Sequence, residues 1–224
     1  MKIVSVNVGL PRPALHNGEP VSTGIFKEPV TGRIALRVLN LDGDRQADLS
    51  VHGGPEKAVY VYPSEHYDFW KGELPEMDLP WGVFGENFTT AGLLETQINI
   101  GDKFRVGSAE VMVTQPRLPC YKLGIRFGRS DMIRRFLVSE RTGFYLSVQK
   151  EGEVGAGDQF EFIETNRQDV SVTDITRLYT TEKRNEGLLR RAIAVAALPQ
   201  SWREYFQERV EKLNHEKGNA NAGN

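Results

Sequence analysis

Short strand-like runs set the main constraint on how this chain can fold. Up to about residue 165, runs of β-branched and aromatic residues alternate with turns rich in Gly, Pro, Asn and Asp. Runs of only a few residues, bounded by turn residues, are typical of β-strands. Strands are expected at residues 2–8, 24–27, 33–39, 97–100, 103–106, 110–115, 145–149 and 159–164. Two helical segments, 64–70 and 130–141, interrupt them. Many short strands with few helices predict a mainly β fold, closed or partly closed into a barrel.

The composition changes after residue 166. Three helices are expected there, at residues 173–179, 186–197 and 201–213. In the third helix Trp202, Tyr205, Phe206, Val210 and Leu213 form one apolar stripe. Helices that each bury a face pack together, so we predict a small three-helix unit. The chain is therefore divided into a barrel domain (1–166), a C-terminal three-helix unit (167–213) and a polar tail (214–224) that we expect to be disordered.

Charge and hydropathy argue against several classes of function. The net charge of −2 provides no field that would recruit nucleic acid or an anionic membrane. Residues 173–217 carry nine Lys and Arg against seven Asp and Glu, a net +2, which favours a structural or docking role over DNA binding. No apolar run approaches the roughly 20 residues of a membrane helix, and the alternating N-terminus is unlike a signal peptide. We expect no nucleic acid or membrane partner and a cytoplasmic location.

Cys120 is the only cysteine among the 224 residues, so it cannot form an internal disulfide. It is either an inert core residue or a reactive or metal-binding group. Pro116 and Pro119 stiffen the backbone that precedes it. Arg117 and Lys122 bring positive charge near the sulfur, which favours the thiolate. Because the thiol also follows the end of a predicted strand, we interpret Cys120 as a site residue.

A second candidate segment runs from His52 to Lys57. Gly53 and Gly54, followed by a proline, form a turn that allows a ligand to approach the backbone. His52 and Lys57 add a donor and a cation suited to phosphate. The alternatives are a tight loop with a surface lysine and a histidine that is only structural. The other histidines are scattered along the chain, which argues against a His/Cys zinc site.

A third segment, Phe84-Gly85-Glu86-Asn87-Phe88, places two polar side chains between aromatic residues. Glu86 and Asn87 could hydrogen-bond a polar ligand or neighbouring backbone, or Asn87 could be a turn residue that tolerates a positive φ. Common phosphate-loop, dinucleotide-binding, serine-hydrolase and zinc-protease motifs are missing from the sequence. A hydrolase built from Cys120, His52 and Glu86 is also conceivable.

Taken together, several ordered motifs carry a family resemblance. They are Val-His-Gly-Gly-Pro-Glu-Lys (51–57), Tyr-Pro-x-Glu-His-Tyr (62–67), Phe-Gly-Glu-Asn-Phe (84–88), Ile-Gly-Asp (100–102) and Gln-Pro-Arg-x-Pro-Cys-Tyr-Lys-Leu (115–123). In this order they resemble the MOSC domain, a β-barrel named after the C-terminal part of molybdenum cofactor sulfurase. More narrowly, they resemble the 6-N-hydroxylaminopurine-resistance (YiiM-type) proteins, which also carry a C-terminal three-helix unit.

The resemblance implies a pocket for the molybdenum cofactor (molybdopterin), with Cys120 as the thiolate ligand to molybdenum. It also implies reduction of N-hydroxylated compounds, such as hydroxylaminopurine bases, to amines. Electrons would come from a separate flavin or iron–sulfur reductase, because one cysteine cannot hold an iron–sulfur cluster. A soft thiolate suits this metal by extension of the hard–soft argument.

The residues of the three candidate segments can be given roles on this basis. Lys57, Arg117, Lys122 and the backbone N–H groups near Gly53 and Gly54 are expected to hold the cofactor's phosphate. His52 is expected to donate protons, because its ordinary pKa lies near neutrality. Glu86 or Asn87 is expected to orient cofactor or substrate.

Three alternatives stay open. The protein could carry the cofactor or its sulfur, through a persulfide on Cys120. Cys120 could be the nucleophile of a metal-free hydrolase. The helical unit could make the chain chiefly an interaction module. The sequence carries no sign of an oligomeric state.

Overall fold

The computed structural model describes residues 1–47, 53–165 and 168–222. Its strands are β1 (Lys2–Val8), β2 (Arg12–His16), β3 (Glu19–Thr23), β4 (Glu28–Pro29), β5 (Arg33–Leu36), β6 (Val59–Pro63), β7 (Phe88–Ala91), β8 (Lys103–Val106), β9 (Ala109–Pro116), β10 (Phe144–Lys150), β11 (Gly152–Gly155) and β12 (Phe160–Glu164). Its helices are η1 (Pro55–Lys57), α1 (Glu65–Glu73), α2 (Tyr121–Phe127), α3 (Met132–Val138), α4 (Val172–Tyr179), α5 (Glu186–Ile193) and α6 (Gln200–Ala222).

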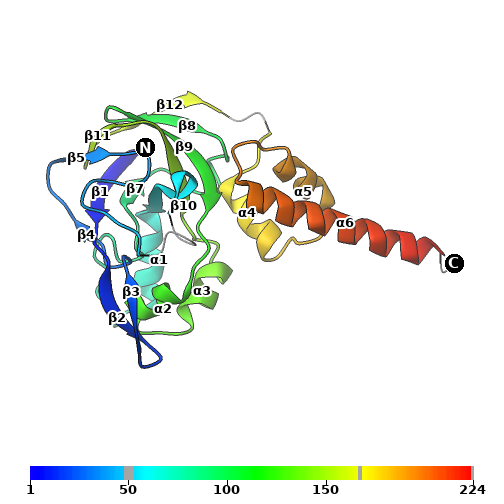
Figure 1. Ribbon diagram of the computed structural model, residues 1–224, viewed down its shortest axis with the longest axis horizontal. Coiled ribbons are helices and arrows are strands. Elements are labelled where there is room, and N and C mark those ends of the chain that lie inside the picture. The colour runs from blue at the N-terminus through cyan, green and yellow to red at the C-terminus, as the bar shows by residue number, and fades with distance from the viewer. Residues whose placement is uncertain (48–52, 166–167, 223–224) are drawn as a thin grey trace.

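Eight strands form the main sheet, in the order β12-β8-β9-β10-β6-β7-β1-β4. Neighbouring strands run antiparallel except β6 and β7, which are parallel. The sheet curls so that the start of β1 meets the chain just before β12 (Figure 1). There the Ile3 N–H donates to the Asp158 carbonyl (2.9 Å), and the Phe160 N–H donates to the Met1 carbonyl (3.0 Å). These bonds largely close the sheet, which confirms the mainly β, barrel-like architecture.

Smaller elements cover the rest of the barrel. β2 and β3 form a hairpin, and β5 pairs with β11. The hairpin turns at Asn17-Gly18, where both residues have positive φ values of 51° and 85°. An Asn-Gly pair with two positive φ angles is the preferred two-residue hairpin turn. α1, α2 and α3 pack on an aromatic cluster that includes Tyr62, Trp70 and Phe84.

The three C-terminal helices stand beside the barrel (Figure 1) and confirm the predicted helical unit. Their buried side chains belong to the same hydrophobic core as the barrel strands. This core joins Ile100 and Val113 of the barrel region to Val172, Leu189 and Phe206 of the helices. No helix within residues 1–47, 53–165 and 168–222 has the length and apolar character needed to cross a bilayer.

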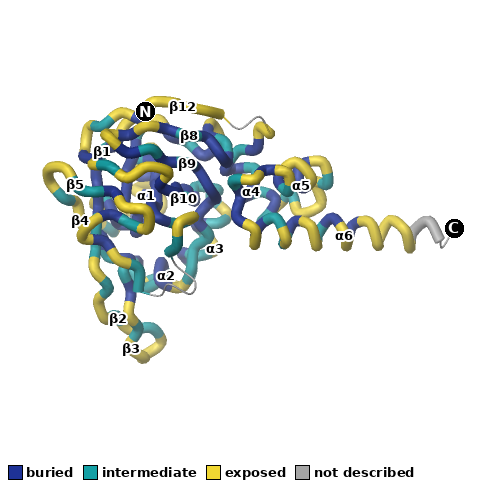
Figure 2. The backbone as a smooth tube through the Cα atoms, turned by 45° about the horizontal axis from the view of Figure 1, so that its top comes forward, coloured by how far each residue is buried: buried dark blue, intermediate teal, exposed yellow. Residues whose placement is uncertain are grey.

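Two predicted strands and the predicted tail differ from the structure. Residues 24–27 connect β3 to β4, and residues 97–100 form a turn, so neither segment is a strand. α6 continues to Ala222, through most of the segment expected to be disordered, and its residues 214–219 are exposed (Figure 2). No proline interrupts this stretch, and Glu216 pairs at 2.7 Å with Arg184 of the loop between α4 and α5. The limits 1–166 and 167–213 stay predictions.

Candidate functional site

A cavity of about 110 Å³ brings most of the predicted site residues together. Three chain segments supply them: η1 with the glycine before it, the residue before β7, and the connection from β9 into α2. The predicted residues in its lining are Gly53, Lys57, Asn87, Arg117, Cys120 and Lys122. Gly54 and Glu86 are not part of this lining. His52, the predicted proton donor, lies outside the described residues.

Cys120 is a half-buried thiol, outside any disulfide, at the junction between a stiff loop and a helix. β9 ends at Pro116, and α2 begins at Tyr121, directly after the cysteine. The cysteine has an extended backbone (φ −118°, ψ 174°), and its carbonyl accepts the Leu123 N–H at 2.9 Å. The chain therefore turns at Cys120, and the thiol lies where the strand-to-helix connection meets the cavity.

Arg117 is a buried cation of the cavity, with only 6% of its surface exposed. Its guanidinium lies over the rings of Tyr60 (4.8 Å) and Phe136 (5.3 Å). Among the described residues, its Nη1 atom has no hydrogen-bond partner. Burial opposes the charge, but the pKa of Arg117 is raised by neighbouring groups, Tyr60 first among them. Arg117 thus points an unused N–H donor from a charged group into the protein interior.

Other charges around the cavity are mostly positive. The described lining includes Lys27, Arg45, Lys57, Arg117 and Lys122, against the single carboxylate of Asp44. Lys27 and Asp44 form a buried ion pair. Burial lowers the pKa of Lys27, and Asp44 opposes this shift. An excess of cations around a small, partly enclosed space favours an anionic ligand.

Asn87 lines the cavity, but its side chain bonds to the protein itself. Its Oδ1 accepts the Tyr60 N–H at 3.0 Å, and its Nδ2 donates to Asp44 at 2.9 Å and to the Asn7 carbonyl at 3.3 Å. Asn87 therefore holds β6, and with it the Tyr60 ring under Arg117. This arrangement makes Asn87 a positioning residue, and bonding to backbone is one of the alternatives that the sequence left open for it.

Glu86 requires a correction, because its carboxylate turns away from the cavity into the core. It is fully buried and accepts hydrogen bonds from the Tyr67 hydroxyl, the Gly82 N–H (2.8 Å), the Phe84 N–H (3.1 Å) and the Thr89 hydroxyl (2.8 Å). Burial raises its pKa, while these donors oppose the rise. Glu86 organises the loop before β7, so the geometry gives no support to a catalytic role.

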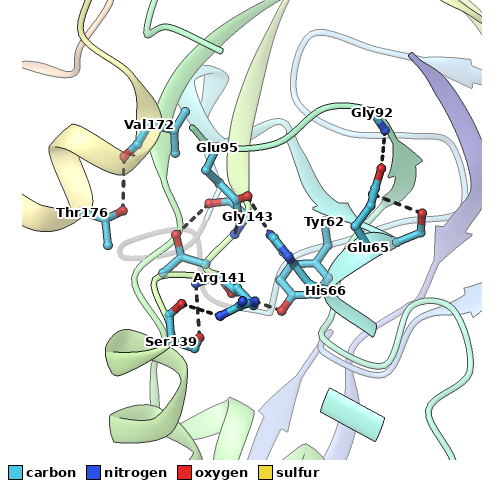
Figure 3. Close-up of polar contacts among 12 residues, drawn as sticks. Tyr62, Glu65, His66, Gly92, Glu95, Ser139, Arg141, Gly143, Val172 and Thr176 are labelled. Atoms are coloured by element: carbon cyan, nitrogen blue, oxygen red, sulfur yellow. Dashed lines mark hydrogen bonds and ion pairs between the residues drawn. The ribbon is translucent and has the colours of Figure 1, made fainter. Parts of the chain in front are cut away.

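Another buried carboxylate, Glu95, bonds to Gly143 and His66 (Figure 3). Its two oxygens lie 2.7 Å from the Gly143 N–H and 2.7 Å from the His66 ring. The Gly143 carbonyl in turn accepts the Arg117 N–H at 3.2 Å. Gly143 has a φ of +64°, and a Cβ at this position would lie 2.3 Å from the Val61 carbonyl oxygen. Only glycine fits here, so Glu95 and Gly143 together set the position of the Arg117 backbone.

Several cavity residues were missed by the sequence analysis. They are Lys27, Asp44, Arg45, Tyr60 and Tyr145. Isolated charges in loops have no periodicity that would distinguish them from surface residues. Burial raises the pKa of the Tyr145 phenol, with Arg117 acting in the opposite direction, so this hydroxyl stays protonated near neutrality. The Asp42-Gly43-Asp44 turn was the one local signal that could have drawn attention to the loop.

A larger cavity of about 400 Å³ adjoins the first on the side of the helical unit. The two cavities share Lys57, Leu118, Cys120 and Tyr145. Its far side consists of residues from α4 and α6. Cys120 therefore faces a small cationic cavity and a larger cavity between the barrel and the helices.

The fold and the cysteine-containing loop define a recognisable class of protein. The MOSC domain model matches residues 48–161, and the model of the YiiM-like 3-alpha helix domain matches residues 170–213. The chain belongs to the MOSC-domain family, in the group with a YiiM-like helical domain.

Individual relatives agree with this assignment. YflK of Bacillus subtilis (strain 168) is 40% identical over 211 residues, which cover 94% of this chain and 95% of that protein. The crystal structure of YiiM from Geobacillus stearothermophilus has a TM-score of 0.78 at 32% identity and covers 93% of this chain and 98% of that one. A Gibberella moniliformis (strain M3125 / FGSC 7600) protein named "Reductase" is 30% identical over 84% of this chain and 34% of its own length.

Proposed function

We propose that this protein binds the molybdenum cofactor in the cationic cavity and reduces N-hydroxylated compounds to amines. Membership of the MOSC family supports the choice of cofactor. The relative named a reductase supports the class of reaction. The balanced reaction converts R–NHOH, two electrons and two protons into R–NH₂ and water. The electrons come from a separate flavin or iron–sulfur reductase, since this chain has one cysteine.

The observation that carries the proposal is the buried Arg117, which lines the cavity that contains Cys120 and whose Nη1 has no hydrogen-bond partner among the described residues. A buried N–H of a charged group without an acceptor is costly, which argues for a bound anion in the working protein. The phosphate of molybdopterin supplies such an anion. Lys122 lines the same cavity from α2 and adds a second cation. The residues present therefore fit this cofactor.

The protein's own groups have distinct tasks in this reaction. Cys120 holds the metal through its thiolate, and the stiff Pro119 keeps the sulfur in place. Arg117, Lys122 and Lys57 hold the phosphate end. When bound, the cofactor supplies the two electrons that cleavage of the N–O bond requires. Tyr145 presents a neutral hydroxyl beside Cys120, and His52 remains the proposed proton donor.

Molybdenum content per chain tests the metal-ligand role of Cys120. The wild type, Cys120→Ser and Ser139→Ala are expressed in a host that makes the cofactor. Ser139 lies between α3 and β10 and is not part of either cavity lining, so it serves as the control. We expect near-stoichiometric molybdenum in the wild type and control and almost none in Cys120→Ser. Equal molybdenum in all three would remove the thiolate ligand from the proposal.

A carrier of the cofactor or its sulfur is the second candidate. The half-buried Cys120 thiol is accessible from two cavities, which suits a persulfide that must be handed on. Mass spectrometry of the intact protein distinguishes the two candidates. A sulfur adduct on Cys120 without bound molybdenum, together with no turnover of N-hydroxylated compounds, would favour the carrier.

A further inference from the structure

The buried pair of His66 and Glu95 has no task in the proposed reaction, although His66 belongs to the motif at residues 62–67. His66 lies on α1 and Glu95 in the connection between β7 and β8. Nε2 of His66 lies 2.7 Å from Oε2 of Glu95 (Figure 3), and because a carboxylate accepts, the ring nitrogen is the donor. Neither residue belongs to the described lining of the two cavities that meet at Cys120. Any effect of the pair on that site must therefore pass through other residues.

The other oxygen of Glu95 connects the pair to three residues before and at the start of β10, which we call the 141–143 segment. Oε1 of Glu95 accepts the Gly143 N–H at 2.7 Å. The three carbonyls of the segment each accept a hydrogen bond: Arg141 from the Tyr62 hydroxyl (3.1 Å), Thr142 from the Tyr60 hydroxyl (2.9 Å) and Gly143 from the Arg117 N–H (3.2 Å). Every residue of the 141–143 segment is thus held by a long-range hydrogen bond.

Two of these bonds act on the Arg117 side chain from different ends. The Gly143 carbonyl accepts the backbone N–H of Arg117, and the Thr142 carbonyl accepts the Tyr60 hydroxyl. The ring of Tyr60 packs against the guanidinium, with its centroid 4.8 Å from the central carbon. Burial raises the pKa of Tyr60 well above its ordinary value, so its hydroxyl stays a donor near neutrality. The 141–143 segment therefore sets both the backbone of Arg117 and the ring against which its guanidinium packs.

Glu95 is itself held by the helical unit. Its backbone carbonyl accepts the Thr173 N–H at 3.1 Å, in the first turn of α4. That turn is closed by a capping box, in which Ser171 and Asp174 exchange hydrogen bonds of 3.1 Å and 2.9 Å. The start of α4 is thus a fixed point, from which the Glu95 side chain reaches Gly143.

We propose that His66 and Glu95 are positioning residues for the anion-binding guanidinium of Arg117. His66 orients the Glu95 carboxylate, Glu95 holds the 141–143 segment, and the segment places Arg117. Hydrogen bonds weaken steeply when distance or angle departs from the optimum, so a small shift of the segment weakens anion binding without removing any group that touches the anion. This inference rests on the anion site of the proposed function, and it gives the helical unit a task in that site.

A double-mutant cycle with inorganic pyrophosphate as the probe tests this coupling. Calorimetry of the full-length, cofactor-free protein gives the dissociation constant for the wild type, Glu95→Ala, Arg117→Met and the double variant. We expect Glu95→Ala to weaken binding roughly 3- to 100-fold when Arg117 is present, and to change it little in the Arg117→Met background. Glu95→Gln keeps an acceptor for the Gly143 N–H and should bind like the wild type.

Two further variants separate positioning from a general loss of stability. Asp102→Ala is the matched control, because Asp102 is a buried carboxylate that accepts the Asn99 N–H at 2.8 Å but lies outside the described linings of both cavities. It should lose stability in urea unfolding and keep its pyrophosphate affinity. His66→Leu leaves the bond between Glu95 and Gly143 in place, so it tests the proposal even if Glu95→Ala does not fold. We expect it to weaken binding by a smaller factor than Glu95→Ala.

The outcomes distinguish this inference from the proposed function. Equal losses of affinity from Glu95→Ala with and without Arg117, or wild-type affinity in both Glu95→Ala and His66→Leu, would overturn the positioning role and leave the anion site intact. A wild type that binds no pyrophosphate would overturn the anion site and this inference together. The expected cycle in a protein that reduces no N-hydroxylated compound would support the positioning role and overturn only the reductase.

Discussion

At the scale of single residues, burial of Arg117 lowers the stability of the free protein. The same residue is the one proposed above to bind an anion. A buried guanidinium loses its hydrogen bonds to water. At Nη1 of Arg117, no acceptor in the described part of the protein replaces them. The rings of Tyr60 and Phe136 pack against the flat guanidinium of Arg117. Its N–H groups lie along the edge of that plane and remain its hydrogen-bonding part. Groups that destabilise the free protein in this way are common in binding sites, because the ligand completes their hydrogen bonds.

Arg117→Met should therefore have opposite effects on folding and binding. We expect the free energy of unfolding of the cofactor-free protein to stay equal or to rise, by up to about 1–2 kcal/mol. Loss of a hydrogen bond between charged partners should weaken binding of an anionic probe, inorganic pyrophosphate, by roughly 10- to 100-fold. Urea unfolding and calorimetry measure the two effects. Arg45→Met is the matched control, because Arg45 lines the same cavity but is exposed.

Glu86 gives a second prediction at the residue scale, since four donors surround its carboxylate. Glu86→Gln turns one acceptor atom into a donor that faces backbone N–H groups. We expect the free energy of unfolding to fall by about 1–3 kcal/mol, while Glu19→Gln on the exposed β3 hairpin should change little. Chemical denaturation measures this. A Glu86→Gln protein with wild-type stability but no turnover would restore the catalytic interpretation.

The sequence predicted the residues of this site better than their roles. Cys120, Arg117 and Lys122 could be found because prolines and charges are concentrated around them. Glu86 and Asn87 were also singled out, but sequence cannot show whether a polar side chain points to a ligand or to backbone. Asn87 bonds to Tyr60 and Asp44, and both partners are distant in the chain. Such long-range hydrogen bonds have no signature in local patterns.

At the scale of elements, the turn before β10 is a sensitive point. Gly143 needs a left-handed backbone and has the Val61 carbonyl oxygen where a Cβ would be placed. Gly128 at the end of α2 has a similar φ, +62°, but no heavy atom within 4 Å of that position. Comparison of the two sites separates backbone strain from steric clash.

Gly128→Ala should therefore cost about 1 kcal/mol from strain alone. Gly143→Ala should cost clearly more, and it should reduce molybdenum content because the Arg117 N–H bonds to the Gly143 carbonyl. Denaturant unfolding and elemental analysis provide the two measurements. Equal stability losses in the two variants would contradict the proposed clash.

Five strands were predicted close to their observed positions, whereas the fully buried strand β6 was not. β1, β8, β9, β10 and β12 lie close to their predicted ranges. β6 was missed because all five of its residues are buried, which leaves no alternation to read. α2 was missed because prolines precede it and Gly124 interrupts it. The Asn17-Gly18 turn could have revealed the β2–β3 hairpin.

At the scale of the whole molecule, one hydrophobic core spans the barrel and the helices. The Glu95 carbonyl accepts the Thr173 N–H at 3.1 Å, and the Ile100 N–H donates to the Val170 carbonyl at 2.9 Å. Backbone bonds of this kind join α4 and the segment before it to the barrel. The helical unit is therefore continuous with the barrel, unlike a module attached by a linker alone.

Deletion of residues 167–224 should accordingly destabilise the barrel, because the helices would no longer shield core residues such as Ile100 and Val113 from solvent. Truncation after Leu213 should shift the melting temperature by only a few degrees, since the exposed pairs made by Glu216 and Lys217 contribute about 0–1 kcal/mol. Calorimetry of both truncations checks this. A barrel that melts unchanged without its helices would instead favour an independent interaction module.

The linings of the two cavities differ in how the chain builds them. Tyr179, Trp202 and Tyr205 lie on two helices of one continuous segment, whereas the cationic cavity draws on loops from distant parts of the chain. A change within the helical segment alters one side of the larger cavity, while the residues that surround the smaller one stay unchanged in sequence. The two cavities that meet at Cys120 can therefore change separately in the course of evolution.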